Sequence, residues 1–220
     1  MQKQIIVTGD GSHTISIGEG ITYHSIHGTI QESMHVYINA GLLHLYQTHE
    51  TLTILEVGLG TGLNALLTTI ASTANNLTIH YTALEPFPLT PMETNMLNYI
   101  LLLPEKEVHT WFYGIHNSEW EKDIDIAPNF KLHKNKQSLI RFSSAQLFHL
   151  IYFDAFAPAV QPELWTTAIF QRLYSMMHPG GILTTYCSKG NVRRAMQSAG
   201  FSIEKLSGPE GKREILRGRK

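Results

Sequence analysis

The sequence predicts an α/β protein in which helices cover both faces of a mainly parallel sheet, with a small β-hairpin at the N-terminus. Short apolar runs typical of strands alternate with helical runs along most of the 220 residues. In addition, a glycine-rich turn at 58–62 separates an apolar strand from a helical run. A strand, a glycine turn and a helix in this order form the first half of the βαβ unit found in Rossmann-like folds.

The chain length and composition fit one main domain. At 220 residues, of which 43% are hydrophobic, the chain is long enough for one α/β domain with a substantial core. We expect residues 51–220 to form this domain, and residues 1–50 to form a hairpin and a helix packed on it. The β-type runs 5–7 and 14–17 flank a Gly-Asp-Gly-Ser turn and predict the hairpin. The helix is predicted over 33–46, where apolar residues recur every three or four positions.

The elements of the main domain follow from the same alternation. Strands are expected at 52–57, 77–84, 150–153 and 182–186, and helices at 63–71, from about 90, at 165–177 and at 191–199. Segments 201–206 and 214–216 are expected to close the sheet as an antiparallel pair. The stretch 104–135 has no clear pattern, but 130–133 and 138–142 indicate a hairpin around Lys134-Asn135-Lys136. Pro179-Gly180-Gly181 indicates a turn.

The formal net charge of −1 conceals an uneven distribution of charge along the chain. Residues 189–220 hold nine Lys or Arg and three acids, whereas residues 1–188 hold eight Lys or Arg and fifteen acids. Because salt screens charges beyond about 10 Å, a local basic surface attracts phosphate even on a neutral protein. The basic segment therefore predicts either contacts with RNA or an ordinary solvated terminus.

Neither a membrane nor a metal is expected as a partner. No apolar stretch is long enough for a signal peptide or a membrane span, and the single cysteine, Cys187, cannot form an internal disulfide. These features are compatible with the cytoplasm. The twelve histidines include the close pair His24 and His27, but no cysteine or acid cluster accompanies them, so we expect no metal site.

The glycine turn is suited to bind a ligand beyond the carboxyl end of its strand. Residues 56–62 bring bare backbone close to the ligand and direct the N–H groups of a helix start at negative charge. S-adenosylmethionine carries such a charge on its methionine carboxylate. A dinucleotide fingerprint would place its third glycine at position 63, where the chain has Leu63, and this favours S-adenosylmethionine over NAD.

Two further strand ends carry carboxylates. Glu85 follows the second strand at about the distance at which Rossmann folds place an acid on the ribose hydroxyls. Asp154 follows a later strand, and Phe156 and Pro158 come directly after it as a stiff, aromatic loop. An acid there is expected to bind or deprotonate an incoming amine. Phe156 and Trp165 are candidates either for stacking on a base or for the core.

These segments together resemble one family. The motifs are Leu-Glu-Val-Gly-Leu-Gly-Thr-Gly-Leu-Asn at 55–64, Phe-Asp-Ala-Phe-Ala-Pro at 153–158, Pro-Gly-Gly at 179–181, Val-Arg-Arg at 192–194 and Lys-Arg-Glu at 212–214. In order and approximate spacing they resemble the methyltransferase domain of the tRNA 5-methylaminomethyl-2-thiouridine biosynthesis bifunctional protein. The likeness runs from about residue 8 to residue 218.

The resemblance implies a Rossmann-like, S-adenosylmethionine-dependent methyltransferase. Its substrate would be 5-aminomethyluridine at the wobble position of tRNA, and its product 5-methylaminomethyluridine. It also implies roles for particular residues. Those that match the cofactor site are Glu56, Gly58, Gly60, Thr61, Gly62, Asn64 and Glu85; Asp154 matches the acid beside the reacting amine; Phe156, Pro158, Arg193, Arg194, Lys212 and Arg213 are expected to contact the substrate.

Two departures from the family pattern change what is expected. The FAD-dependent oxidase half of the bifunctional protein is missing, so a separate enzyme is expected to supply the aminomethyl substrate. The acidic segment that helps to hold adenine is replaced by Ser-Ser-Ala-Gln at 143–146, so Ser144 or Gln146 is expected to bind the adenine amine.

Two other functions stay open from the sequence. One is a methyltransferase that acts on a small-molecule or protein amine, for which the basic segment would be incidental. The other is a non-catalytic RNA- or protein-binding module that keeps the fold with a disabled pocket, and the altered 143–146 segment favours it.

Overall fold

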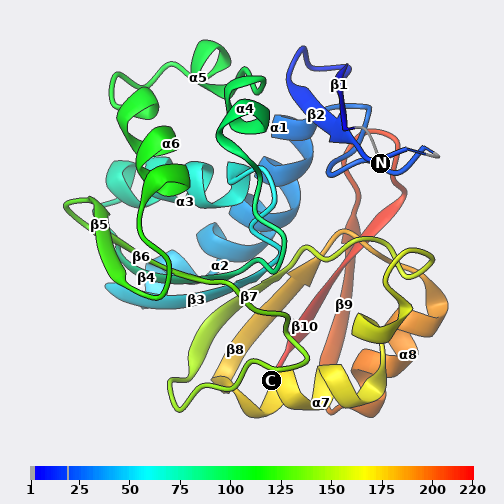
Figure 1. The fold of residues 1–220 in the computed structure, drawn as a ribbon. Helices are drawn as coiled ribbons and strands as arrows, with labels where there is room; N and C mark the ends of the chain where they lie inside the picture. Colours follow the sequence, from blue (N-terminus) through cyan, green and yellow to red (C-terminus); the bar gives the residue numbers. More distant parts are fainter. Residues whose placement is uncertain (1–2, 19) are drawn as a thin grey trace.

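The computed structural model describes residues 3–18 and 20–220. Over this part of the chain, an eight-stranded sheet in the order β5-β6-β4-β3-β7-β8-β10-β9 lies between two layers of helices (Figure 1). The five strands from β6 to β8 are parallel to one another, and the outer strands β5, β10 and β9 are antiparallel to their neighbours. The predicted mainly parallel α/β fold is therefore confirmed.

The strand ends place the glycine turn and the acids at one edge of the sheet. The parallel strands are β3 (Thr51–Val57), β4 (Thr78–Leu84), β6 (Phe130–Asn135), β7 (Phe148–Phe153) and β8 (Met177–Thr185); the others are β5 (Asp123–Ala127), β9 (Ser202–Ser207) and β10 (Glu214–Arg219). In β3, Val57 is opposite Leu84 of β4 and Phe153 of β7. Because all three strands run in the same direction, the residues that follow them emerge side by side.

The N-terminal hairpin is confirmed as a separate two-stranded sheet. Strands β1 (Gln4–Val7) and β2 (His13–Ser16) pair antiparallel. The turn between them is held by Asp10, whose carboxylate accepts hydrogen bonds from the backbone N–H of Ser12 and the hydroxyl of Thr8. Short polar side chains of this kind stabilise turns by bonding to nearby backbone.

The helix predicted over 33–46 is part of a longer helical segment with an unusual centre. It begins as α1 (Thr29–Ser33), continues as the π-helix η1 (Met34–Leu42), and ends as α2 (Leu43–Leu45) and the 3₁₀ turn η2 (Tyr46–Thr48). In η1, Gly41 lies directly on the sheet: a Cβ there would be 3.1 Å from Cε1 of Tyr152 and 3.4 Å from Oγ1 of Thr184. This close approach brings Tyr37, one turn earlier, towards the end of β7.

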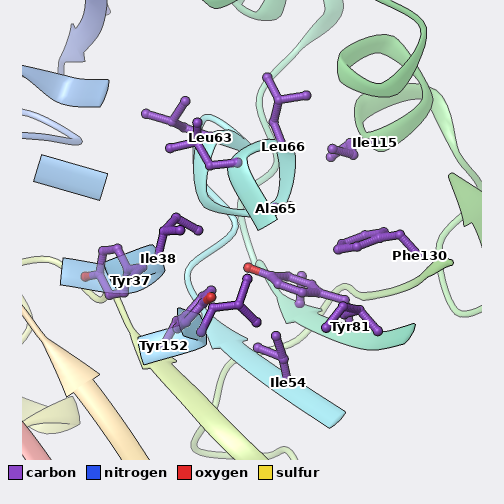
Figure 2. Close-up of a cluster of buried hydrophobic side chains, with 14 of the residues drawn as sticks. Tyr37, Ile38, Ile54, Leu63, Ala65, Leu66, Tyr81, Ile115, Phe130 and Tyr152 are labelled. Atoms are coloured by element: carbon purple, nitrogen blue, oxygen red, sulfur yellow. The ribbon is translucent and has the colours of Figure 1, made fainter. Parts of the chain in front are cut away.

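Helices α3 and α6 lie with η1 on one face of the sheet, and α7 and α8 cover the other (Figure 1). The remaining helical bounds are α3 (Leu63–Ala74), α4 (Pro91–Asn95), α5 (Tyr99–Leu102), α6 (Val108–Asn117), η3 (Pro162–Leu164), α7 (Thr167–Ser175) and α8 (Gly190–Ser198). Alternate strand residues supply the two cores, as in β7, where Leu150 and Tyr152 face one layer and Ile151 and Phe153 the other. Figure 2 shows the first core, in which Tyr37, Tyr81 and Tyr152 pack with aliphatic side chains.

Two local predictions were wrong. The partner of β6 in the edge hairpin is β5, which precedes it, and not 138–142, which forms a turn. The polar run at 134–136 was interpreted as the hairpin turn, but Lys134 is buried in β6, and its Nζ donates to the carbonyl of His116 at the end of α6 and lies over the Trp120 ring. The second wrong prediction is the turn at Pro179-Gly180-Gly181. These residues lie inside β8, where the register with β7 is irregular.

The contact at Gly41 generates a stability prediction. We expect Gly41→Val to lower the free energy of unfolding by about 1–3 kcal/mol, because the added side chain would overlap Tyr152 and Leu150. The measurement is chemical denaturation. Gly114→Ala in α6 is the matched control, since its Cβ would make only ordinary contacts with Ile126, the nearest at 3.6 Å, and alanine favours a helix. Equal stability of the two variants would contradict the proposed close packing.

Candidate active site

A cavity of about 550 Å³ opens at the carboxyl ends of β3, β4 and β7. Its wall includes Gly58 and Gly60 from the glycine turn, Glu85 after β4, and Asp154 and Phe156 after β7. The three strand ends that the sequence analysis singled out therefore face a single space. The size is within the range of small-molecule sites.

The glycines of the turn are required by close contacts and by backbone conformation. Gly58 has φ +93°, and a Cβ on it would be 2.8 Å from the carbonyl oxygen of Asp154. Gly60 has φ +50°, and a Cβ would be 3.0 Å from the ring of Tyr23. Only glycine adopts such positive φ values without strain and leaves this room. The turn is thus held between the loop after β7 and the N-terminal segment.

Glu85 connects the second strand end to the glycine turn. One carboxylate oxygen accepts a hydrogen bond from the backbone N–H of Gly60 at 2.9 Å, and the other accepts from Phe87 at 2.8 Å. Burial raises the pKa of Glu85, and the two hydrogen bonds act in the opposite direction. Each oxygen keeps a further lone pair, which is what an acceptor for ribose hydroxyls needs.

Asp154 is held from two sides. The hydroxyl of Tyr37 donates to its Oδ1 at 2.6 Å, and the amide of Asn64 donates to its Oδ2 at 2.9 Å. Burial raises the pKa of Asp154, whereas nearby His24 and these hydrogen bonds lower it. The carboxyl group lies at the cavity wall, where it can meet a ligand.

Several residues expected at the cofactor lie behind the wall instead of in it. Glu56 is fully buried and accepts a hydrogen bond from Asn64 at 3.0 Å, and its burial raises its pKa well above the usual range. Thr61 is buried and hydrogen-bonded to His24 at 2.8 Å, and Gly62, with φ +72°, is the N-cap residue directly before α3. Glu56, Thr61, Gly62 and Asn64 therefore shape the turn and support Asp154 from behind.

The N-terminal segment forms a wall of the cavity that the sequence analysis did not foresee. Lining residues there are Gly20, Ile21, Thr22, Tyr23, His24, Ser25 and Glu32. Tyr23 contacts Phe156 edge-on, with ring centroids 5.1 Å apart. His24 was considered only as a metal ligand, since this irregular segment has no motif and its contacts are distant in sequence.

Of the residues predicted to contact the substrate in the loop after β7, some line the cavity and others do not. Phe156 lines it together with Ala157 and Val160, whereas Pro158 does not. Trp165 is in the core: it is buried, its Nε1 donates to the carbonyl of Phe156 at 2.8 Å, and its ring contacts Phe153. Phe156 is thus free to meet a substrate, and Trp165 holds the loop in place.

Ser144 lies away from the cavity. It belongs to a separate polar hollow of about 310 Å³ with Gln146, and its hydroxyl bonds within its own loop to that residue. The reason is topological: β6 ends at Asn135, so the residues directly after it stand at the carboxyl edge, whereas Ser144 is close to the start of β7. Gln137, Ser138 and Leu139 line the cavity in its place.

Of the basic residues expected at the substrate, Lys212 lines the cavity. Its ammonium group forms an ion pair with the buried carboxylate of Glu32 and lies 4.1 Å from the centre of the Tyr186 ring. Arg193 and Arg194 are on α8, and Arg213 is exposed beside Lys212; these three lie outside the cavity.

Within residues 3–18 and 20–220, no three His, Cys, Asp or Glu side chains gather in a way that could hold a metal ion. The helices described for this part of the chain are also all too short or too polar to span a membrane.

The geometry of the glycine turn generates a prediction about ligand binding. We expect Gly58→Ala to lose most of its affinity for S-adenosylmethionine, because its Cβ would push the backbone of Asp154 away; the strain is of the order of 1–3 kcal/mol. Calorimetric titration measures the affinity. Gly180→Ala is the matched control, since Gly180 also has a positive φ of +80° but open space around its Cβ. Unchanged affinity in Gly58→Ala would refute this role of the turn.

Comparisons with known proteins agree with this geometry. Residues 117–220 match the sequence profile of a family described as S-adenosyl-L-methionine-dependent methyltransferase. The chain is 29% identical to the tRNA 5-methylaminomethyl-2-thiouridine biosynthesis bifunctional protein MnmC of Burkholderia mallei (strain SAVP1), and 29% identical to the protein of the same name from Paraburkholderia xenovorans (strain LB400). Both alignments cover 90% of this chain and 32% of the relative, so the chain spans about a third of the length of these relatives.

A solved structure has a similar fold over nearly the whole chain. The crystal structure of MNMC2 from Aquifex aeolicus superposes with a TM-score of 0.81 at 22% identity, covering 99% of this chain and 69% of that one. This likeness concerns the fold, including the mainly parallel sheet. The resemblance inferred from the motifs is thereby confirmed: residues 117–220 match a family of S-adenosyl-L-methionine-dependent methyltransferases, the chain is similar over 90% of its length to part of the MnmC proteins, and its fold is similar to that of MNMC2.

Proposed function

We propose that the protein methylates the amine of 5-aminomethyluridine at the wobble position of tRNA, giving 5-methylaminomethyluridine. The observation that carries this proposal is the position of Asp154: its carboxyl group lies in the wall of the same cavity as the glycine turn and Glu85. The names of the relatives, which refer to 5-methylaminomethyl-2-thiouridine in tRNA, support this substrate. In this proposal the tRNA arrives already aminomethylated by a separate enzyme, and the reaction takes place in the cytoplasm.

The residues present fit S-adenosylmethionine. Gly58 and Gly60 offer bare backbone at the cavity wall, and Glu85 presents a carboxylate with lone pairs for the ribose hydroxyls. Gln137 and Ser138, which follow β6, offer polar groups where we propose that the adenine is held. When bound, the cofactor supplies an electrophilic methyl group.

Asp154 is suited to prepare the amine. An aliphatic amine is mostly an ammonium ion at neutral pH and has no free lone pair, so a proton must leave its nitrogen before a bond to carbon can form. A carboxylate oxygen of Asp154 can accept that proton, or hold the ammonium group by a charge-assisted hydrogen bond before the proton passes to water. Phe156 and Tyr23, in contact at the wall, would face the uracil ring.

The basic C-terminal segment is proposed to contact the tRNA backbone. Lys212 lies in the cavity wall, and Arg213 follows it in an exposed position, while Arg193 and Arg194 lie on α8 beside this end of the sheet. Arginine side chains bind phosphates strongly in this kind of setting. Bound phosphates here would leave a splayed-out base within reach of the cavity.

The decisive test is to incubate the protein with S-adenosylmethionine and tRNA that carries 5-aminomethyluridine, and to analyse the nucleosides by mass spectrometry. We expect 5-methylaminomethyluridine, and a loss of about 10²–10⁴-fold in rate for Asp154→Asn, because the asparagine amide cannot accept the proton.

The control for that test is Asp123→Asn on the exposed edge strand β5, which should retain the wild-type rate. Methylation of free small amines without any modification of the tRNA would show a small-molecule methyltransferase instead. Wild-type turnover in Asp154→Asn would remove Asp154 from the chemistry.

The proposed phosphate contacts predict a steep dependence of tRNA binding on salt. Each phosphate contact contributes about −0.7 to −0.9 to the slope of log K against log salt concentration. Arg213→Ala, which removes one contact, should therefore make the slope shallower by about 0.7 to 0.9. Filter binding across a salt series measures it. Lys122→Ala, an exposed cation next to the opposite edge strand β5, should leave the slope unchanged. The same slope in wild type and Arg213→Ala would argue against this contact.

A further inference from the structure

Four polar side chains from four different elements meet beneath the cavity wall. Tyr37 comes from η1, Asn64 from α3, Glu56 from β3 and Asp154 from the loop after β7. Tyr37 donates to Oδ1 of Asp154 at 2.6 Å, and the Asn64 amide donates both to Oδ2 of Asp154 at 2.9 Å and to Oε1 of Glu56 at 3.0 Å. Each oxygen of Asp154 therefore has one protein donor, one from η1 and one from α3.

We propose that Tyr37 and Asn64 are positioning residues that hold Asp154 as a carboxylate, with one acceptor site on each oxygen left for the substrate amine. A carboxylate offers about four acceptor sites, and the two hydrogen bonds occupy one on each oxygen. This inference rests on the proposed function of Asp154 as the group that meets the amine. The motifs did not predict this role: Asn64 was expected to contact the cofactor, and Tyr37 was given no role.

The donors are needed because the surroundings of Asp154 disfavour a negative charge. Burial raises its pKa, and the carboxylate of Glu32 adds to this effect. The hydrogen bonds from Tyr37 and Asn64 stabilise the ionised form, as does the neighbouring His24. Without them, Asp154 would hold its proton at higher pH and would lose its capacity to take one from the amine.

The other titratable groups around Asp154 are consistent with a single unpaired negative charge here, on Asp154. Glu56 lies beneath it, fully buried, and its Oε2 has no hydrogen-bond partner among the described residues. Burial raises the pKa of Glu56 well above the usual range, and the neighbouring Asp154 raises it further, which favours the protonated form of Glu56. Tyr81 and Tyr186 are neutral phenols there, and the charge of Glu32 is balanced by Lys212.

A matched pair of tyrosines separates hydrogen bonding from packing. Tyr37 and Tyr152 are both buried in the same core, with ring centroids 5.2 Å apart (Figure 2). The hydroxyl of Tyr37 bonds to Asp154, whereas that of Tyr152 is paired with Thr68 at 3.3 Å. Tyr37→Phe and Tyr152→Phe each remove one buried hydroxyl and keep the ring, and only the first removes a donor to Asp154.

The test is a carbon-13 NMR titration of protein labelled at Cγ of aspartate. The chain has four aspartates, Asp10, Asp123, Asp125 and Asp154, and Asp154→Asn identifies the resonance of interest. We expect the Asp154 titration to move to higher pH in Tyr37→Phe and to stay in place in Tyr152→Phe. In the tRNA assay, kcat of Tyr37→Phe should fall about tenfold, with its acidic limb shifted to higher pH and the S-adenosylmethionine affinity unchanged.

An Asp154 titration at the same pH in wild type and Tyr37→Phe, or an equal shift in both tyrosine variants, would overturn the proposal. If Tyr37→Phe does not fold, Asn64→Ala removes the other donor and should shift the titration in the same direction; no shift there would overturn it as well. The titration needs no tRNA, so it remains readable if the protein fails to methylate 5-aminomethyluridine. That failure would count against the proposed function and not against the arrangement of the donors.

Discussion

The contact between Gly58 and the backbone of Asp154 is the constraint on which the rest of the site depends. Strands β3 and β7 are neighbours, and the N–H of Asp154 donates to the carbonyl of Val57 at 3.1 Å, so the pairing of the strands continues into both loops. A side chain at position 58 would separate them. The fixed distance between the glycine turn and the acid is therefore a property of the sheet, and a ligand that fills the turn is necessarily near Asp154.

The sequence predicted the parts of the site that sit at strand ends. Gly58, Gly60, Glu85 and Asp154 were identified because each follows an apolar strand, and parallel strands bring their carboxyl ends to one edge. The residues predicted from the motif alone are placed differently. Asn64 and Thr61 belong to the same motif as the glycines, but they lie in the first turn of α3 or just before it, and their side chains point into the protein.

The remaining features could not be predicted because they depend on contacts between distant segments. Tyr23 and His24 reach the cavity through the hairpin and the segment that follows it, and nothing in their local sequence indicates where that segment packs. The edge hairpin was misplaced for a different reason. The polar segment 134–136 has the composition of a turn. Lys134 is nevertheless buried, because its ammonium group contacts the carbonyl end of α6 and the Trp120 ring.

The distribution of partners among the acids explains why Asp154 is the group suited to the chemistry. Five carboxyl groups lie in or behind the cavity wall. Glu163 is exposed, and three others already have partners: Glu32 is paired with Lys212, Glu56 accepts a hydrogen bond from Asn64, and Glu85 accepts from two backbone N–H groups. Asp154 has donors that stabilise its charge but no cation in a salt bridge with it in the described part of the chain. An ammonium group that enters the cavity would supply the missing positive charge. The same pairing that binds the substrate then places a proton acceptor next to its nitrogen, so binding and activation require a single carboxylate.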